Sequence, residues 1–274
     1  MTTNPQQLFN LTGRTGIITG GAGILGKKLV PGLLACGANV VIADRDYEAA
    51  SLLANELSIK YGERVIAVSC DVANIDSVKA MVDTTVSRYG DIHYLLNNAA
   101  TDAKNPKNYY APFEDYDLAE WRRVMSINLD GVFLVAQAVG KRMVTQGKGG
   151  SIVQTSSIYG MMASDNRIYE GSTFKGYPIN NPAVYSASKA AVVGLTRWLA
   201  TYWAGHNIRV NAVAPGGVQG YENETFMKLY SNRVPMARMA QAEELVGTMV
   251  YLVSEASTYV TGQCLFVDGG LSAW

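Results

Sequence analysis

Short runs rich in β-branched residues alternate with longer segments of helical periodicity along the whole chain. This alternation is typical of a parallel sheet with helices on both faces, because each strand is reached from the previous one through a helical crossover. The expected strands lie at Gly16–Thr19, Asn39–Ala43, Arg64–Ser69, Ile92–Leu96, Ser151–Gln154, Ile208–Val213 and Gln263–Val267. The expected helices lie at Gly23–Cys36, Glu48–Tyr61, Ile75–Tyr89, Leu118–Met143, Pro182–Trp203 and Ala242–Leu252. The pattern predicts an α/β fold, a doubly wound seven-stranded parallel sheet formed by residues 1–274 as a single domain.

Two stretches show no clear periodicity, Thr101–Asp117 and Ile158–Asn181. Long irregular segments inside a compact domain are usually functional, so both are candidate ligand-binding loops. Inside the first expected helix, Pro31 removes one backbone hydrogen bond and predicts a kink. The sequence assigns no role to this proline.

The composition argues against several classes of partner. Positive and negative residues balance to a formal net charge of zero, which disfavours nucleic acid and anionic membranes as partners. Cys36, Cys70 and Cys264 form no CxxC pair, and an odd number of separated cysteines favours reduced thiols. The N-terminal residues lack a basic start and an apolar stretch, and no apolar run is long enough to span a bilayer. A cytoplasmic location is therefore expected.

A glycine-rich turn, Thr19-Gly20-Gly21-Ala22-Gly23-Ile24-Leu25-Gly26, follows the first expected strand and leads directly into a helix. Such a turn presents backbone N–H groups and the positive end of a helix to a pyrophosphate, as in Rossmann-type dinucleotide sites. Candidate cofactor residues here are Gly20, Gly23, Ile24, Leu25 and Gly26. The alternative is a tight strand-to-helix turn that binds no ligand.

The second expected strand ends at Asp44, about 20 residues beyond the glycines. A carboxylate at this point can accept hydrogen bonds from ribose hydroxyls and repels a 2′-phosphate, so NAD is favoured over NADP. The adjacent Arg45 could instead pair with that phosphate, which keeps NADP or dual use open. A further alternative for Asp44 is a helix N-cap.

Several short motifs follow in one order along the chain. They are Cys70-Asp71-Val72, Asn97-Asn98-Ala99-Ala100, Asn128, Ser156-Ser157, Tyr185-Ser186-Ala187-Ser188-Lys189, Pro215-Gly216, Val260-Thr261-Gly262-Gln263 and Val267-Asp268-Gly269-Gly270. Together with the glycine turn, this ordered set resembles the short-chain dehydrogenase/reductase superfamily from Thr19 to Gly270. The resemblance implies an NAD(P)-dependent enzyme acting on CH–OH groups that assembles as a homotetramer or homodimer. It also implies cofactor contacts from Asp71, Val72, Asn98, Ala99, Ala100, Pro215, Gly216 and Val218. In that scheme Asp71 contacts adenine, and Val218 meets the nicotinamide carboxamide.

Three positions depart from the family's usual motifs. Glycine is replaced by Ile24 in the turn, the last glycine of NNAG is Ala100, and the threonine often found after the PG turn is Gly220. The GxxGxxG spacing that results is similar to a longer, sugar-nucleotide-modifying branch. It leaves open an isomerase or dehydratase that keeps NAD bound. A non-catalytic NAD-sensing protein is the third alternative.

The expected chemistry centres on Tyr185 and Lys189, which lie four residues apart and therefore share one helix face. An ammonium beside the phenol is expected to lower the pKa of Tyr185 and to make proton transfer feasible, whereas in isolation such a pair is usually a surface feature. Ser157, at the carboxyl end of a strand, is expected to hold the substrate oxygen; the alternative is a loop-capping serine. By the resemblance, Asn128 anchors a water that serves Lys189.

The stretch between Ser157 and Tyr185 is roughly 15 residues longer than a plain crossover loop. An insertion there overhangs the carboxyl edge of the sheet and is expected to cover the substrate as a lid around residues 158–181. Its candidate substrate residues are Asp165, Arg167, Tyr169 and Glu170, whose groups suit hydroxyls and an anion. The expected substrate is a small alcohol or ketone of sugar type, including a sugar acid or phosphate. The alternative is a solvated or subunit-contacting loop. His93 and His206 have no ligand-spaced partners, so no metal is expected.

Overall fold

A seven-stranded parallel sheet forms the centre of the protein. The computed structural model describes residues 4–101, 103–220 and 223–274. The strands follow the order β3-β2-β1-β4-β5-β8-β9 and are all parallel. Their bounds are β1 Thr15–Thr19, β2 Asn39–Asp44, β3 Val65–Ser69, β4 Tyr94–Asn97, β5 Gly150–Thr155, β8 Ile208–Pro215 and β9 Cys264–Val267. The predicted doubly wound sheet is confirmed, and its strand order reverses between β1 and β4.

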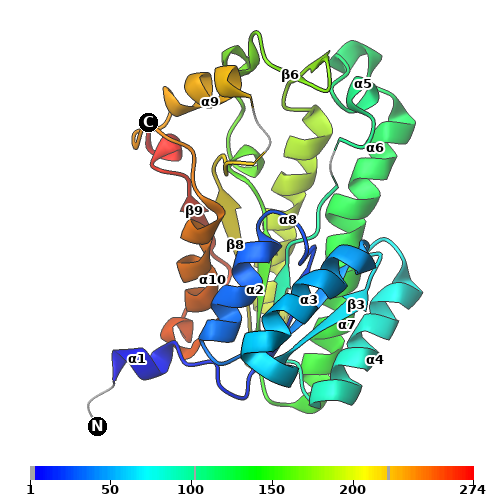
Figure 1. Cartoon of the computed structure of the whole chain (residues 1–274), viewed down its shortest axis with the longest axis vertical. Helices are drawn as coiled ribbons and strands as arrows, with labels where there is room; N and C mark the ends of the chain where they lie inside the picture. Colours follow the sequence, from blue (N-terminus) through cyan, green and yellow to red (C-terminus); the bar gives the residue numbers. More distant parts are fainter. Residues whose placement is uncertain (1–3, 102, 221–222) are drawn as a thin grey trace.

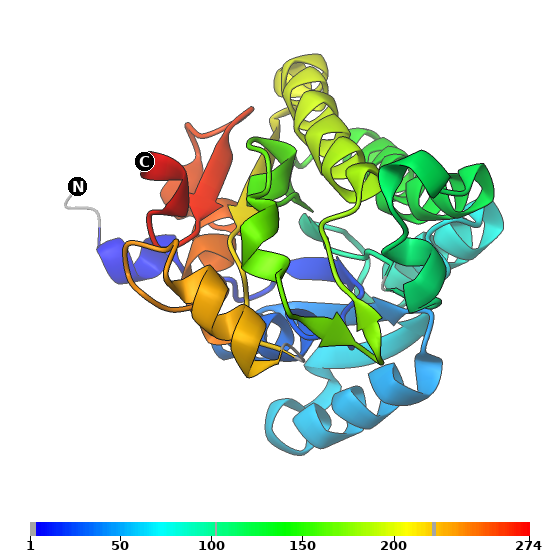
Figure 2. The same cartoon turned by 90° about the horizontal axis from the view of Figure 1, so that it is seen from above.

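Helices cover both faces of this sheet because the strands are apolar on both sides. Successive residues of β1 point to opposite faces, so Ile17 and Ile18 are both buried but belong to different core clusters. The layer on the Ile18 side contains α2 (Gly26–Ala35), α3 (Tyr47–Tyr61) and α10 (Val246–Val253). The opposite layer contains α4 (Ile75–Tyr89), α7 (Gly131–Gln146) and α8 (Ala183–Tyr202). Figure 2 shows α3 and α8 on opposite sides of the sheet.

The long helix expected over Leu118–Met143 is present, and it contains one π-helical turn that the sequence did not predict. The chain forms α6 (Leu118–Met125), then a π-helical turn at Ser126–Asp130, then α7. A π turn inserts one extra residue per turn and redirects the side chains it carries. Asn128 lies at the centre of this turn.

Pro31 does not end α2, although the sequence predicts a kink there. The helix begins at Gly26 rather than at Gly23 and continues through Pro31 to Ala35. Next to the proline, Gly32 allows a close approach of α10, because a Cβ at this position would lie 2.4 Å from Cγ1 of Val246. The Pro31-Gly32 pair therefore lies where two helices of the same layer pack together.

The two irregular stretches contain short elements that gather above the carboxyl edge of the sheet. They are α5 (Pro106–Tyr109), the 3₁₀ turns η4 (Ile158–Gly160) and η5 (Asn166–Tyr169), and the antiparallel hairpin of β6 (Thr173–Phe174) and β7 (Tyr177–Pro178). A further helix that the sequence reading missed, α9 (Glu224–Ser231), lies beside them (Figures 1 and 2).

The remaining elements are short. They are α1 (Pro5–Leu8), η1 (Gly62–Arg64), η2 (Phe113–Asp115), η6 (Ala204–His206), η7 (Ala242–Leu245), η8 (Glu255–Ser257) and η9 (Leu271–Ala273). Of these, η2 belongs with the elements above the carboxyl edge of the sheet, and the others lie elsewhere. Among the residues that the structure describes, no helix is long and apolar enough to cross a bilayer.

One tight contact in the sheet provides a test of the core. Gly16 pairs with Tyr94 across β1 and β4, and a Cβ at Gly16 would lie 1.9 Å from the buried ring. Gly16→Ala should therefore lower the free energy of unfolding by about 3 kcal/mol, the upper end of typical overpacking costs. Gly194→Ala is the matched control, because nothing lies within 4 Å of a Cβ on this exposed helical glycine. The control should stabilise the protein by about 0.5–1 kcal/mol. Equal denaturation midpoints for the two variants would contradict the packing described.

Candidate active site

A cavity of about 950 Å³ follows the carboxyl edge of the sheet, where ligands bind in open α/β folds. Nearly all of the sequence-predicted cofactor and catalytic residues line it. These are Gly20, Gly23, Ile24, Leu25, Asp44, Arg45, Asp71, Val72, Asn98, Ala99, Ala100, Ser157, Tyr185, Lys189, Pro215, Gly216 and Val218. Two predicted residues, Gly26 and Asn128, lie behind the cavity wall and do not line it.

The glycine turn leaves room for a ligand backbone because side chains cannot be accommodated in it. Gly20 has φ +62°, and a Cβ there would lie 3.0 Å from Cα of Ala99. A Cβ on Gly26 would lie 2.4 Å from the carbonyl oxygen of Gly21. Helix α2 has no side-chain cap at Leu25, and since the N–H groups of Lys27 and Lys28 donate to the carbonyls of Gly23 and Leu25, an anion would be bound by the N–H groups that precede them in the turn. The turn therefore fits the pyrophosphate of a dinucleotide.

Asp44 fixes this turn to the end of β2. Its Oδ2 accepts the backbone N–H of Ala22 at 3.0 Å, and its Oδ1 accepts that of Asp46 at 3.0 Å. A carboxylate can accept further hydrogen bonds, so both roles are compatible with contact to ribose hydroxyls. The N-cap of α3 is Asp46 rather than Asp44. Arg45 is exposed at this end of the cavity.

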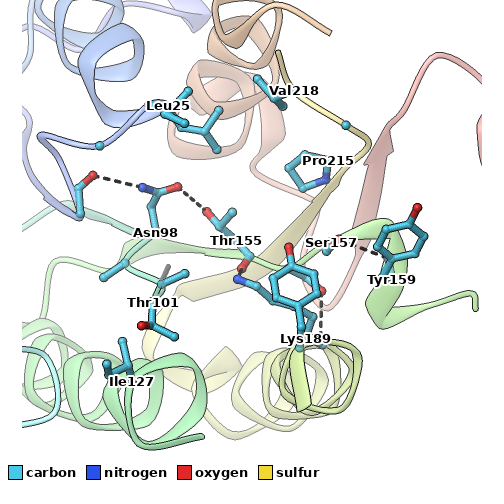
Figure 3. A pocket seen from close by; sticks show the side chains of 18 of the residues that line it. Leu25, Asn98, Thr101, Ile127, Thr155, Ser157, Tyr159, Lys189, Pro215 and Val218 are labelled. Carbon is cyan, nitrogen blue, oxygen red and sulfur yellow. Dashed lines mark hydrogen bonds between the residues drawn. The ribbon is translucent and has the colours of Figure 1, made fainter. Parts of the chain in front are cut away.

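Asn98 joins the ends of three strands. Its Nδ2 donates to the backbone carbonyl of Thr19 at 3.3 Å. Its Oδ1 accepts from Thr155 Oγ1 at 3.2 Å, a bond drawn in Figure 3. Thr19 Oγ1 in turn accepts the N–H groups of Asn98 and Ala99 at 2.9 and 3.1 Å. These bonds link β1, β4 and β5 at the carboxyl edge of the sheet. Thr155 was not identified from the sequence.

Lys189 is buried at the junction of β5 and α8. It is 3% exposed, and its Nζ donates to the backbone carbonyl of Thr155 at 2.8 Å (Figure 3). Ser156 Oγ donates to the Lys189 carbonyl at 2.8 Å, which ties the strand end to the helix a second time. As the four-residue spacing predicts, Nζ lies near Tyr185, 5.9 Å from the centre of its ring.

Burial controls the protonation of this pair. Desolvation lowers the pKa of Lys189 from 10.5 to about 8. Desolvation also raises the pKa of Tyr185, and a hydrogen bond with the Ser157 side chain opposes that rise. The sequence-based expectation of a lowered pKa for Tyr185 is therefore wrong for this structure, because loss of hydration raises it and the hydrogen bond with Ser157 is what opposes the rise.

Ser157 caps a loop, the alternative given for it from the sequence, and it also lies against Tyr185. Its Oγ accepts the N–H of Tyr159 at 3.2 Å and so caps η4, while its side chain also meets Tyr185. Gly160, three residues after Ser157, has no room for a side chain, because a Cβ there would lie 2.6 Å from the carbonyl carbon of Lys189. The cap and the glycine together hold Ser157 against α8.

Asn128 acts on the polypeptide around the cavity. It is fully buried, and its Oδ1 accepts the N–H of Thr101 at 2.9 Å while its Nδ2 donates to Ser188 Oγ at 3.4 Å. Arg123 donates to Thr101 Oγ1 at 2.7 Å and forms a bidentate pair with Glu120. The π turn thus fixes the loop after β4 to α6 and α8.

The inserted segment contributes less to the cavity than the sequence suggests. Of the four predicted substrate residues, Tyr169 lines the cavity, whereas Asp165, Arg167 and Glu170 do not. The Arg167 guanidinium is 77% exposed and makes a two-bond ion pair with Asp165, at 2.8 Å for each bond. The reason is local, because two residues in the same turn pair with each other before either can reach a ligand.

Aromatic residues that were not predicted form much of the wall at this end. They are Tyr109 of α5 and the adjacent Tyr110, Tyr159 of η4, and Phe226 and Tyr230 of α9. For α9 a signal was present, since Asn223 caps the helix and Phe226 and Tyr230 follow at helical spacing. No comparable pattern marks Tyr109 or Tyr159.

No metal site is found in the part of the chain that the structure describes, where no group of three or more His, Cys, Asp or Glu side chains could hold an ion. His93 has a structural partner, because its Nδ1 accepts the N–H of Thr15 at 3.0 Å.

Comparison with known proteins gives consistent similarity over nearly the full length. A family model described as enoyl-(acyl carrier protein) reductase matches residues 21–272. A 2,5-dichloro-2,5-cyclohexadiene-1,4-diol dehydrogenase of Sphingobium indicum is 34% identical over 97% of this chain and 100% of its own. An NADH-dependent L-xylulose reductase of Ambrosiozyma monospora is 31% identical over 97% of both chains.

Similarity to solved structures extends equally far. The crystal structure of a gluconate 5-dehydrogenase from Burkholderia cenocepacia, in complex with NADP and tartrate, has a TM-score of 0.85 and 34% identity. The match covers 99% of this chain and 100% of that one. These similar proteins therefore include one named for NADH and one bound to NADP.

The pKa of Lys189 gives a prediction for stability. Between about pH 8 and about pH 10.5 the unfolded chain binds a proton at Lys189 that the folded chain has lost. The destabilising effect of this buried group on the folded state therefore decreases as the pH rises. Below about pH 8 its burial costs roughly 3 kcal/mol. Lys189→Met removes that cost, so the stability of the variant relative to wild type should be greatest below pH 8 and decline towards pH 10.5.

Chemical denaturation at several pH values measures this difference. Lys141→Met, at an exposed position of α7, is the matched control and should show a difference that does not vary with pH. A pH-independent difference for Lys189→Met would exclude a buried ammonium with a lowered pKa.

Proposed function

This chain belongs to the short-chain dehydrogenase/reductase superfamily, and on that premise we propose that it is an NAD-dependent enzyme that interconverts a secondary alcohol and a ketone on a polar, hydroxylated substrate. As a member of the superfamily it is an NAD(P)-dependent dehydrogenase/reductase acting on CH–OH groups. The proposal extends this to the cofactor, to the substrate class and to the residues that act. All 274 residues would serve as one catalytic domain.

The observation that carries the proposal is the convergence of three side chains in the cavity. Tyr185 makes a side-chain hydrogen bond with Ser157, and the Lys189 ammonium lies 5.9 Å from the Tyr185 ring centre. All three line the cavity at the carboxyl edge. A proton carrier, an oxygen-binding hydroxyl and a cation in contact are the groups that alcohol oxidation requires.

In oxidation, the phenolate form of Tyr185 would accept the hydroxyl proton of the substrate and become the phenol, while Ser157 donates a hydrogen bond to the same oxygen. In reduction, Tyr185 would return the proton to that oxygen, and its raised pKa supports this donor role. Lys189 would stabilise negative charge on the phenolate and bind ribose hydroxyls. Asn128 would hold the loop after β4 through its bond to Thr101.

The cofactor site has the features that a dinucleotide needs. The glycine turn would hold the pyrophosphate and Asp44 the ribose hydroxyls, while Pro215, Gly216 and Val218 would surround the nicotinamide. A bound nicotinamide cofactor would supply the hydride acceptor in oxidation and the hydride donor in reduction. The carboxylate of Asp44 supports NAD over NADP, because it would oppose a 2′-phosphate.

Two further observations support the substrate and assembly parts of the proposal. Similar proteins act, by name, on L-xylulose and on gluconate, which are polyhydroxylated. On α7 and α8, the exposed aromatic side chains Phe133, Trp198 and Tyr202 form an apolar face, with Trp198 and Tyr202 stacked at 4.7 Å. Such a face favours a homodimer or homotetramer.

The proton-transfer role is tested by Tyr185→Phe, which keeps the ring and removes the hydroxyl. We expect kcat to fall by at least about two orders of magnitude while NADH binding, measured by fluorescence titration, stays unchanged. Tyr202→Phe, at an exposed position of the same helix, is the matched control and should retain full activity. Activity within a few-fold of wild type in Tyr185→Phe would remove this residue from the chemistry.

Cofactor choice is tested by Asp44→Asn, which keeps an acceptor for the Ala22 N–H but removes the charge. The KM for NADP should fall relative to that for NAD by about tenfold or more, because the repulsion of the 2′-phosphate is lost. Steady-state kinetics with both cofactors measures this ratio, and Arg45→Ala should leave the KM for NAD unchanged. A wild-type enzyme that prefers NADP would refute the NAD assignment.

A further inference from the structure

Five tyrosines surround the end of the cavity near Tyr185. This tyrosine wall consists of Tyr109, Tyr110, Tyr159, Tyr169 and Tyr230. All but Tyr110 are close enough to Tyr185 to interact with it electrostatically, and Tyr110 packs edge-on against Tyr109 with ring centres 5.0 Å apart. The wall therefore faces the position where the reacting carbon of a substrate must lie.

The rings of the wall are held in place from several elements. Tyr169 stacks on Phe226 of α9 with ring centres 5.4 Å apart, and it shares a side-chain hydrogen bond with Tyr159. The Tyr230 hydroxyl accepts the N–H of Gly217, in the loop after β8. These contacts make the wall a preformed surface rather than a set of loose side chains.

The wall is electrically neutral. Burial raises the pKa of Tyr109, Tyr159, Tyr169 and Tyr230, so these phenols carry no charge at physiological pH. Asn181 also lines the cavity, and its Nδ2 donates to Oγ of Ser186, the residue after Tyr185, at 2.7 Å, which places its amide in the same part of the cavity. Phenols and amides both donate and accept hydrogen bonds, and ring faces pack against C–H groups, a combination that suits polyols.

The arginines nearest to the wall are already paired with carboxylates. Arg233 makes an ion pair of 3.4 Å with Asp165, which also binds Arg167. Arg123 makes its bidentate pair with Glu120. Each of these arginines is therefore paired with a carboxylate, although Arg233 shares that of Asp165 with Arg167.

Among the described residues that line the end of the cavity near Tyr185, Lys189 is the single side chain with a positive charge. Its Nζ donates to the backbone carbonyl of Thr155. The first turn of α8 adds only the partial charge of a helix N-terminus. The positions that the structure does not describe, residues 1–3, 102, 221 and 222, include no lysine, arginine or histidine. A carboxylate or phosphate bound against the wall would lose its hydration without gaining a counter-ion of its own.

We infer that the substrate is an uncharged polyhydroxylated compound, a polyol or cyclic diol and its ketone, and that sugar acids and sugar phosphates are poor substrates. This inference rests on the proposed function and narrows it. It also replaces the sequence-based expectation of an anion held by Arg167, whose guanidinium is bound to Asp165 outside the cavity.

Matched substrate pairs test the inference. D-sorbitol and D-gluconate, and likewise D-arabinitol and D-arabinonate, differ only by a hydroxymethyl group against a carboxylate at one end. With saturating NAD, and with the corresponding ketones and NADH, we expect kcat/KM for the better neutral compound to exceed that of its carboxylate partner by at least about 100-fold. The same order should hold for sorbitol phosphate against sorbitol.

A charge introduced into the cavity should change this preference. Asn181→Lys places an ammonium at the wall and should raise kcat/KM for gluconate relative to sorbitol by about tenfold or more. Asn166→Lys, the same substitution at an exposed position of η5 outside the cavity, is the matched control and should leave the ratio unchanged. Thermal denaturation of both variants establishes that they fold.

The outcomes of these experiments distinguish a failure of the inference from a failure of the proposed function. Turnover of gluconate or arabinonate at rates equal to or above those of the neutral partners overturns the inference but leaves the proposed function intact. An unchanged ratio in folded Asn181→Lys also overturns it, because the neutrality of the wall would then not decide specificity. If neither series is oxidised or reduced, the proposed substrate class fails and the inference fails with it.

Discussion

The burial of one ammonium group, that of Lys189, organises the site. A charge placed at the junction of β5 and α8 must be hydrogen-bonded, and the carbonyl of Thr155 satisfies it at 2.8 Å. Ser156 and Gly160 then allow the strand end and η4 to lie close against the helix. Ser157 follows directly in the chain, so the position of the lysine also determines that of the serine. The β5–α8 junction thus ties the candidate catalytic groups to the rigid sheet.

The cofactor end depends on a different principle, the parallel direction of the strands. Because β1, β2, β4 and β5 end at one edge, residues distant in sequence meet there with little need for long side chains. Asp44 reaches the glycine turn through Ala22, and Asn98 reaches Thr19 and Thr155. The polar contacts at this edge mostly involve backbone groups, which explains why glycine and asparagine recur in the motifs.

Sequence reasoning succeeded where position follows from periodicity. Strand ends and the four-residue spacing placed Asp44, Ser157, Tyr185 and Lys189 in one cavity. It failed where the outcome depends on tertiary contacts. Periodicity cannot show how deeply a side chain is desolvated, so the sign of the pKa shift of Tyr185 was missed. Nor could it show that Arg167 pairs within its own turn. The π turn was hidden because Asn128 is held by bonds to distant segments.

Helix α9 touches both the inserted segment and the loop that follows β8. Phe226 stacks on Tyr169, Asn223 donates to the carbonyl of Thr173, and Tyr230 binds the Gly217 N–H. The inserted segment and the segment after β8 therefore share one packing surface, although the bonded residues Asn223 and Thr173 are 50 residues apart in the sequence. Loop grafting between members of the superfamily would have to move both together. If residues 158–181 alone were replaced by the segment of another member, Phe226 of α9 would lose its stacking partner Tyr169. A shift of α9 would in turn disturb the hydrogen bond between Tyr230 and the backbone N–H of Gly217.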